Sequence, residues 1–342
     1  MQPHPFPAVE LASGANLALD IGLGYRSSMP AVTPQVIAVV ATHRRPATLA
    51  RLLASLTPAK ARGLEEVIVV DNAADKETDR VVRSSLLPCR YLPQAVNLGS
   101  GGGTAIGFKA ALDNPAVTHC WQIDDDAVVE PDTLSRLLAG LEATGAAAAV
   151  PLLENEAGEV SWFPGLHDPR KWQVILRRGL KPADYLRECG DEPVSFTWSP
   201  WCVFLVTRIA IKTVGLPRTD FGFMAEDIEF TLRLTARFPA VLVPSARSLH
   251  LPPKKKDGVE GHYTECLNLQ NMSFLTVRLA HGRRALRHLP GAYWRFFRRQ
   301  GWSMRTLQDA TRAGWRGAVA GRPGGAPGYD GFRMAWAKIR EQ

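Results

Sequence analysis

The sequence predicts an α/β protein built on a doubly wound, mostly parallel sheet, followed by a helical, basic C-terminal extension. Short apolar runs alternate with helical patterns from residue 35 to residue 141, which is the pattern of β-α-β units. Several of these runs end in polar residues, and in a parallel sheet such ends meet at one edge. We therefore expect an N-terminal arm or short strands over 1–34, an α/β domain over 35–260 and the basic extension over 261–342.

The elements of the first half can be assigned in order. Residues 36–40 are a short, continuous apolar run, and residues 66–70 are four apolar residues after Glu66; such runs are typical of strands buried on both faces. Between them, the leucines of residues 47–56 have the i, i+3, i+4, i+7 spacing of one helix face. The other elements expected in this half are strands at 90–93 and 119–123, and helices after Asp71, over 104–112 and over 131–141.

The alternation stops after about residue 150, where scattered Gly, Pro and Trp predict irregular structure or antiparallel strands over 154–200. The elements expected beyond it are a strand over 201–207, a loop and helix within 221–238, a short strand over 240–243, and helices over 264–280 and roughly 290–320.

The charge is concentrated at the C-terminal end. The 342 residues carry a formal net charge of +8, with 46% hydrophobic and 22% charged residues, as in ordinary folded domains. Residues 251–342 contain 17 Lys and Arg but only 6 Asp and Glu, whereas residues 1–250 contain 24 and 27. The positive charge is therefore a property of the extension, and the larger part of the chain is slightly acidic.

The cysteines and the apolar segments indicate a reducing compartment. The five cysteines are odd in number and form no CxxC pair, which argues against a disulfide framework or a zinc ribbon. The N-terminal residues show no signal peptide pattern, and no apolar run reaches the length of a membrane-spanning helix. These features predict a cytoplasmic protein.

Three adjacent carboxylates, Asp124, Asp125 and Asp126, follow the strand expected at 119–123. Alternate residues of an extended segment point the same way, so Asp124 and Asp126 can face one ligand. Carboxylate oxygens suit Mg²⁺ or Mn²⁺, which commonly also binds phosphates. A solvated acidic loop is the alternative, but the position at the ligand edge of the sheet favours a cation site.

Two features near the expected ligand edge have both a functional and a structural interpretation. The glycine run at 99–103 precedes a helix and would let a backbone approach an anion, although a flexible turn explains it equally well. It matches neither a dinucleotide-binding fingerprint nor a phosphate-binding P-loop. Asp71, at a strand end, could bind a base or a ribose, or it could cap the next helix.

Later candidates are also ambiguous when taken alone. Glu226 and Asp227 lie between aromatic residues, where burial would raise a carboxylate pKa toward that of a general base, but they could also complement a helix dipole. His250 could bind a metal, although a lone histidine is more often a surface or core residue. Trp198 and Trp201 could stack on a sugar or pack in the core.

Six segments, taken together and in order, resemble the glycosyltransferases of family 2, which have the GT-A fold. They are VIAVVATHRRPATLARLLASL, EEVIVVDNAAD, NLGSGGGTAIGF, WQIDDDAVVEPDTL, FMAEDIEFTLRL and a final LH. The NLGSGGG segment is similar to the NxGGxGG of galactofuranosyltransferase- and rhamnosyltransferase-like members, except that Ser100 replaces a glycine. The resemblance covers roughly residues 35–275 and makes 35–260 the expected GT-A catalytic domain.

The resemblance implies a role for each matching position. Asp124, Asp126 and His250 would bind Mn²⁺ or Mg²⁺, and Asp227 would be the base that deprotonates the acceptor. The positions implied for binding the donor are Thr42, Arg45, Asp71, Asn97, Gly101, Gly102 and Asp125. Those implied for the acceptor or the sugar are Trp198, Trp201 and Glu226.

The resemblance also implies the reaction. A sugar would pass with inversion from a nucleotide diphosphate sugar, UDP- or dTDP-linked, to a hydroxyl of a glycan or polyprenyl-linked acceptor. Arg, Trp and Phe interleave in the basic extension, which is typical of helices on anionic lipid surfaces but also of a solvated helix face. The first interpretation would place the enzyme peripherally on the inner face of the membrane.

Two other classes of protein fit part of the pattern. A nucleic-acid-binding protein would account for the basic extension but not for the carboxylates, and no nucleic-acid-binding signature is present, so no nucleic acid is expected as a partner. A metal-dependent nucleotidyltransferase would usually carry a glycine-rich loop directly after the first strand. This chain has Thr42-His43-Arg44-Arg45 there instead.

Overall fold

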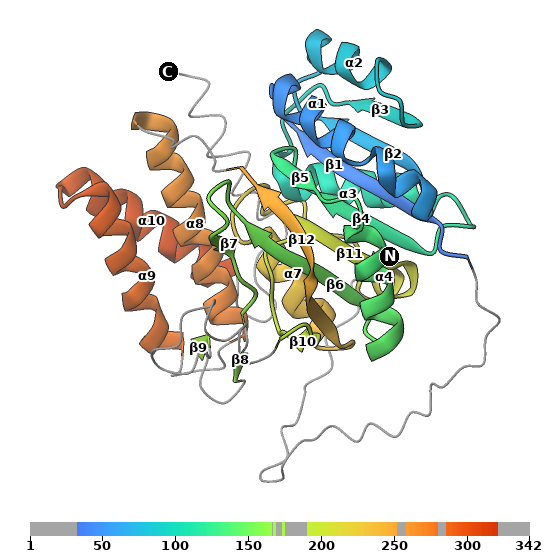
Figure 1. Ribbon diagram of the computed structural model, residues 1–342. Coiled ribbons are helices and arrows are strands. Elements are labelled where there is room, and N and C mark those ends of the chain that lie inside the picture. The colour runs from blue at the N-terminus through green and yellow to red at the C-terminus, as the bar shows by residue number, and fades with distance from the viewer. Residues whose placement is uncertain are drawn as a thin grey trace, which may run out of the picture. The chain divides into compact units, whose positions relative to one another are not determined.

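The computed structural model describes residues 33–165, 167–168, 173–174, 190–251, 258–279 and 285–320. The arm expected over 1–34 therefore lies almost wholly outside the described residues, as do residues 321–342 of the basic extension. The predicted fold class is confirmed: a curled, mixed sheet carries helices on both faces, and further helices follow it (Figure 1).

One sheet contains ten strands of the described chain, in the order β10-β12-β6-β11-β4-β1-β2-β3, with β5 paired to β12 and β7 to β6. Their bounds are β1 Val36–Thr42, β2 Leu64–Asp71, β3 Cys89–Pro93, β4 His119–Ile123, β5 Ala127–Val129, β6 Ala148–Glu154, β7 Val160–Trp162, β10 Val194–Ser195, β11 Val203–Thr207 and β12 Ala240–His250. Two short strands, β8 His167–Asp168 and β9 Gln173–Val174, pair separately.

The helices follow the strands as the sequence pattern predicts for most of the chain. Their bounds are α1 Pro46–Ser55, the 3₁₀ helix η1 Thr57–Arg62, α2 Lys76–Arg83, α3 Gly99–Leu112, α4 Thr133–Thr144, α6 Arg208–Val214, α7 Glu226–Thr235, α8 Gly258–Leu279, α9 Ala285–Gln300 and α10 Met304–Ala320.

The strand order creates a switch point between β1 and β4. The chain runs outward from β1 through β2 to β3 in parallel, and then returns to place β4 on the other side of β1. Ligands of such sheets bind beyond the carboxyl ends at this point. Strand β11 lies antiparallel to β4, so that its first residue, Val203, pairs with the last residue of β4, Ile123.

Alternation along β1 fills both layers of the core. Val36, Ala38 and Val40 pack on the face covered by α1 and α4, whereas Ile37 and Val39 pack on the opposite face with residues of α3 and α7. Successive side chains of a strand point to opposite faces, so a continuous apolar run is what a sheet covered on both sides requires. This rigid double layer holds the strand ends that carry the site.

Three elements differ from the sequence-based expectation. Helix α3 begins at Gly99, so the glycine run is helical and not a loop before residue 104. Strand β12 extends to His250 because the ladder resumes after a register shift between Val243 and Arg247, where Pro244 lacks a donor. The helix expected over 290–320 is two helices, since Gly301 has a left-handed φ of 75° and closes α9 by donating its N–H to the carbonyl of Phe297.

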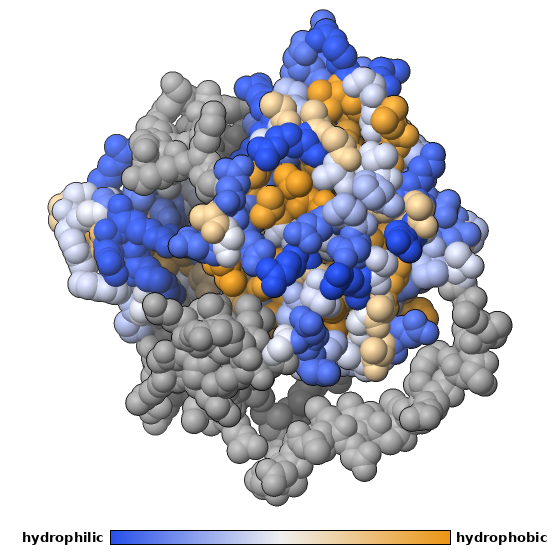
Figure 2. Space-filling model, viewed as in Figure 1, coloured by the Kyte–Doolittle hydropathy of each residue, from blue (hydrophilic) through white to orange (hydrophobic). Residues whose placement is uncertain are grey.

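Helices α8, α9 and α10 pack together and bury their own small core. Helix α8 begins at Gly258, before the division expected between residues 260 and 261. Among the described residues, no helix is long and apolar enough to cross a membrane. In Figure 2 the part of the surface formed by α9 and α10 is mainly hydrophilic.

Candidate active site

The ends of β1 and β4 meet at the switch point, as the sequence predicts. The hydroxyl of Thr42 donates to Oδ2 of Asp125 at 2.6 Å. The guanidinium of Arg45 donates through Nη1 to Oδ1 of Asp125 at 3.0 Å and to Oδ2 of Asp126 at 2.7 Å. Thus the loop after β1 neutralises part of the acidic triplet, and a displaced Arg45 could reach an anion bound there.

The three carboxylates differ in their protonation equilibria. Burial raises the pKa of Asp125 to about 6, although the charge of Arg45 and the hydrogen bond from Thr42 oppose this. Burial and the charge of Asp126 raise the pKa of Asp124. Burial also acts to raise the pKa of Asp126, but His250 and Arg45 outweigh it and the pKa falls. Asp124 is therefore the carboxylate of the triplet that has the least compensating positive charge beside it.

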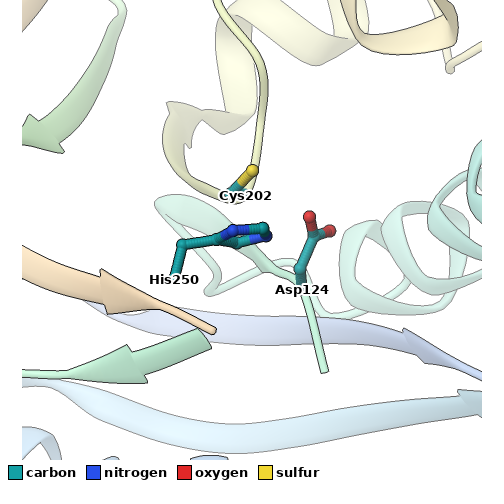
Figure 3. A group of neighbouring side chains, drawn as sticks. All are labelled: Asp124, Cys202 and His250. Atoms are coloured by element: carbon teal, nitrogen blue, oxygen red, sulfur yellow. The ribbon is translucent and has the colours of Figure 1, made fainter. Parts of the chain in front are cut away.

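Asp124 lies beside two groups that come from distant parts of the chain. Ligand atoms of Asp124, Cys202 and His250 all lie within 4.8 Å of one another, and Figure 3 shows the three side chains facing one another. The N–H of Asp124 donates to the carbonyl of Cys202 at 2.8 Å, directly before the β4–β11 ladder. Strand β12 pairs with β5, which aligns His250 with Ala127, one residue after the triplet.

His250 links the triplet to the same cluster. Its side chain is buried, and its Nε2 lies 3.3 Å from Oδ1 of Asp126. Burial lowers the pKa of His250, but the hydrogen bond and the charge of Asp126 outweigh it, so the pKa is raised. Carboxylate, imidazole and thiol groups within a few ångströms are a donor set that fits a divalent cation.

The structure thus brings together the three residues predicted to bind metal, Asp124, Asp126 and His250, and adds Cys202. The sequence contained no signal for Cys202, because its spacing matches no metal-binding pattern. Its proximity to Asp124 depends on the antiparallel pairing of β11, which local sequence patterns do not specify.

Two further carboxylates, Glu226 and Asp227, begin α7 at the edge of this cluster. Burial raises the pKa of Asp227 to about 7, and the charge of Asp124 contributes in the same direction. Burial and the neighbouring Asp227 raise the pKa of Glu226 well above its usual value. Oε2 of Glu226 is buried and has no hydrogen-bond partner among the described residues. Since both pKa values respond to Asp124, these groups share one electrostatic site.

The loop before α7 has an unusual backbone that a distant residue holds in place. Met224 and Ala225 have left-handed φ values of 70° and 66°, which cost free energy in residues with side chains. Nδ2 of the fully buried Asn271, on α8, lies 3.2, 3.2 and 2.7 Å from the carbonyl oxygens of Phe221, Phe223 and Met224. Helix α8 therefore fixes the backbone that aims Glu226 and Asp227.

We expect Asn271→Asp to impair the site more than its stability loss alone would suggest. A carboxylate cannot donate to the three carbonyls, and an unsatisfied buried group costs about 1–3 kcal/mol. At a temperature where the variant is folded, kcat should fall and the donor KM should change little, because the loop lies beside Asp227 and not in the triplet. Ser273→Ala is the matched control, since Ser273 is equally buried on α8 but bonds only Leu269. An unchanged kcat for Asn271→Asp would contradict this positioning role.

The glycines of α3 permit close packing. The N–H of Gly101 donates to the carbonyl of Gly222 at 2.8 Å, and a Cβ on Gly101 would lie 2.9 Å from the carbonyl oxygen of Arg218. A Cβ on Gly99 would lie 2.1 Å from the oxygen of Gly222, and one on Gly102 would lie 2.6 Å from Cβ of Leu98. The run therefore seats the loop before α7 against α3, while donor binding by Gly101 and Gly102 remains a prediction.

Asp71 and Asn97 make local bonds in this structure. The carboxylate of Asp71 is fully buried and accepts from the N–H groups of Ala73 and Asp75 and from the hydroxyl of Tyr91, at 2.7–2.9 Å. The side-chain oxygen of Asn97 accepts from the N–H of Gly99 at 2.8 Å. Both residues thus stabilise turns at the ligand edge, and their contact with a donor remains a prediction.

The two tryptophans differ in exposure. Trp201 is only 3% exposed and packs on Phe230 in the core, with ring centroids 5.8 Å apart. Trp198 is half-buried and lies over Gly165, with which it forms an isolated β-bridge. The geometry of Trp201 matches the core-packing alternative. A sugar can therefore reach the ring of Trp198 more easily than that of Trp201.

Solved structures with a similar architecture identify the fold. GalNAc-T7 with UDP, GalNAc and Mn²⁺ superposes with a TM-score of 0.54 at 18% identity, covering 70% of this chain and 48% of that one. TarS 1–349 of S. aureus in complex with UDP gives a TM-score of 0.53 at 15% identity, covering 90% and 91%. The chain therefore has the GT-A fold of glycosyltransferases.

The sequence comparisons show which known proteins the chain is similar to. Residues 37–197 match the family model described as Glycosyl transferase family 2. Galactofuranosyltransferase GlfT1 of Mycobacterium tuberculosis is 32% identical over 210 residues, which are 59% of this chain and 65% of the relative. GlfT1 of Mycolicibacterium smegmatis is 35% identical over 149 residues, or 43% of this chain and 45% of the relative. Residues 37–197 thus match a glycosyltransferase family 2 model, and the chain is similar to galactofuranosyltransferases, of which its match spans less than two thirds.

Proposed function

We propose that the protein transfers a sugar, with inversion, from a nucleotide diphosphate sugar to a hydroxyl of a glycan or polyprenyl-linked acceptor. The observation that carries this proposal is the location of a high-pKa carboxylate, Asp227, beside the cation-ligand cluster that contains Asp124. A transferase needs both groups within one site, because the leaving diphosphate and the attacking hydroxyl react at the same carbon. The similarity to galactofuranosyltransferases supports the choice of reaction.

Each of these residues would have a separate role in the reaction. Asp124, Asp126 and His250 would hold Mn²⁺ or Mg²⁺, which would supply positive charge to the leaving diphosphate. Thr42 orients Asp125 in the structure, and Arg45 lies close enough to exchange a carboxylate for a phosphate. Asp227 would accept the proton of the acceptor hydroxyl as that oxygen attacks the anomeric carbon from the side opposite the diphosphate.

A panel of donors tests the proposal. The full chain is incubated with UDP- and dTDP-linked hexoses, UDP-galactofuranose among them, with Mn²⁺, Mg²⁺ or EDTA, and nucleoside diphosphate release is measured with and without a hydroxylated glycan or polyprenyl-linked acceptor. We expect acceptor-stimulated release with one donor and its loss in EDTA. Release of pyrophosphate from a nucleoside triphosphate and a sugar phosphate would instead identify a nucleotidyltransferase.

The pKa of Asp227 predicts opposite pH trends for activity and stability. A base must be unprotonated, so kcat/KM should rise with pH and level off above an apparent pKa of about 7, or lower when a bound cation stabilises the carboxylate. Because the folded-state pKa is raised from 3.8, the folded protein holds a proton that the unfolded chain has lost. The stability contributed by this group is therefore present at acidic pH and is lost as pH rises toward 7.

Paired pH series measure both trends. Donor turnover gives the kcat/KM profile, and urea unfolding of the metal-free protein gives the free energy of unfolding at the same pH values. In Asp227→Asn the free energy of unfolding should fall less between pH 3.8 and about 7 than in wild type, because the titrating carboxyl group is absent. A turnover that falls continuously as pH rises from about 5 to 8 would contradict the base assignment.

We also propose that the outer face of α9 and α10 rests on an anionic membrane surface. Trp294, Trp302 and Trp315 are 60–68% exposed, and Met304 and Leu307 are exposed beside them. The arginines exposed on the same two helices and the turn between them are Arg295, Arg298, Arg299, Arg305, Arg312 and Arg316. Aromatic rings and arginines together suit the interface of an anionic bilayer, which would keep a lipid-linked acceptor near the site.

Vesicle binding tests the membrane proposal. The protein should sediment with vesicles containing phosphatidylglycerol at low salt and dissociate as salt is raised, because each arginine near the surface contributes about 1 kcal/mol. Replacing Trp302 and Trp315 with Ser should weaken this binding, whereas Leu86→Ser, which removes an exposed apolar residue outside α9 and α10, should not. Failure to bind anionic vesicles at low salt would contradict the membrane proposal.

A further inference from the structure

Cys202 occupies a position where packing alone does not explain a thiol. It precedes β11 and is buried to 6% exposure, yet its sulfur faces a carboxylate and an imidazole instead of only apolar groups. Both Cys202 and Cys120, on β4, belong to apolar core clusters, but only Cys202 also has a carboxylate and an imidazole beside its sulfur among the described residues. The two cysteines therefore differ in their neighbours and not in their burial.

The position of the sulfur is fixed by backbone pairing. The carbonyl of Cys202 accepts from the N–H of Asp124 at 2.8 Å, and the next residues pair as Val203 with Ile123 in the antiparallel ladder. Strands β11 and β4 are central in the sheet, so this register cannot shift without disturbing the core. The backbone that carries the thiol is thus held beside Asp124 by the same ladder.

The three donors have different chemical preferences. A carboxylate oxygen suits hard cations such as Mg²⁺, whereas a thiolate binds borderline and soft cations and binds Mg²⁺ poorly. Their ligand atoms all lie within 4.8 Å of one another, which requires only a small inward movement to place one ion within bonding distance of all three. Asp126 lies next to His250 and completes the polar surroundings.

We propose that Cys202 is a sulfur ligand of the divalent cation at Asp124 and His250, so that the site favours thiophilic cations such as Co²⁺ or Zn²⁺ over Mg²⁺. This inference rests on the cation site of the proposed function, and it adds a ligand and a metal preference. The competing explanation is that the thiol only packs and donates a hydrogen bond to Asp124. A serine at the same position would preserve that hydrogen bond but not the sulfur–metal bond.

Cobalt spectroscopy separates the two explanations without any turnover. The metal-free full chain is titrated with Co²⁺, and the sulfur-to-cobalt charge-transfer band in the near ultraviolet is recorded together with the visible d–d bands. The wild type and the control Cys89→Ser, which alters a cysteine on β3, should both show the band. Cys202→Ser should lose the charge-transfer band while still binding Co²⁺, and its Co²⁺ affinity should fall by about tenfold or more.

The comparison of cations gives a second readout. In thermal melts, Cys202→Ser should lose most of the stabilisation by Co²⁺ or Zn²⁺ but keep that by Mg²⁺, and Cys202→Ala serves if the serine variant does not fold. A wild-type protein that binds Co²⁺ without the band, or that binds no Co²⁺, would overturn the proposal. Persistence of the band in Cys202→Ser would also overturn it. If the protein transfers sugar with Mg²⁺ but shows no sulfur-to-cobalt charge-transfer band, the proposal for Cys202 fails and the proposed function stands.

Discussion

Asp227→Asn should lower kcat by about 10²- to 10⁴-fold, which is the usual contribution of a positioned general base. Asp227 is half-buried at the start of α7, and its pKa of about 7 suits proton transfer near neutral pH. Asparagine has nearly the same size, and its side-chain oxygen can still accept from the N–H of Ile228, as Oδ1 of Asp227 does at 2.7 Å. Folding should therefore be preserved, and loss of a half-buried charge beside Asp124 should raise the metal-free melting temperature.

Donor affinity distinguishes a base from a donor ligand. Calorimetric titration with the donor and Mn²⁺ should give a Kd within about twofold of wild type, because an interaction made mainly in the transition state changes kcat and not ground-state binding. The alternative, that Asp227 merely complements the dipole of α7, is worth only about 0.3–1 kcal/mol. Glu77→Gln, which removes an exposed first-turn carboxylate of α2, is the matched control and should leave kcat unchanged. Equal losses of donor affinity and kcat in Asp227→Asn would refute the base assignment.

Asp124→Ala should abolish the effect of Mn²⁺ on donor binding. Its carboxylate is the member of the acidic triplet that lies within reach of both Cys202 and His250, while Asp125 and Asp126 are engaged by Arg45. Loss of a direct ligand should weaken cation and donor binding by at least about 100-fold, the upper end of what loss of a supporting residue alone costs. The metal-free protein should be no less stable, because the substitution removes repulsion with Asp126.

Thermal shift measures this prediction. A cation at 100 times its Kd stabilises a folded protein by about 2.7 kcal/mol, so Mn²⁺ with UDP should raise the melting temperature of wild type but not of Asp124→Ala. Asp132→Asn, which alters an exposed carboxylate before α4, should respond like wild type. A variant at Asp124 that keeps the full shift would show that the cation binds elsewhere.

The C-terminal helices are more than an appendage to the GT-A domain. The net charge suggested a separate basic extension, and α9 and α10 do carry exposed arginines. Yet Asn271 on α8 holds the loop that leads to Glu226 and Asp227. A truncation before α8 should therefore impair the site as well as any contact with a membrane. Charge patterns described the outer surface of the extension, but not its inner contact with the loop.

The sequence by itself determined the fold class and predicted most of the residues that meet at the switch point. Apolar runs that alternate with helical patterns specified the parallel half of the sheet, because period and burial are local properties of the chain. The polar residues at the strand ends identified Thr42, Arg45 and the acidic triplet, which the structure joins at one edge. The family resemblance was confirmed by the match of residues 37–197.

Tertiary structure alone decided which distant groups meet. Cys202 reaches Asp124 through antiparallel pairing of β11 with β4, and His250 reaches it through a strand that continues beyond Pro244. Glycines 99–103 look like a ligand loop in sequence, but they form the start of a helix against which the loop before α7 packs. Local patterns report which face a residue buries. Strand order and register between remote segments depend on the packing of the whole core, so the cation cluster and the Asn271 contact became visible only in three dimensions.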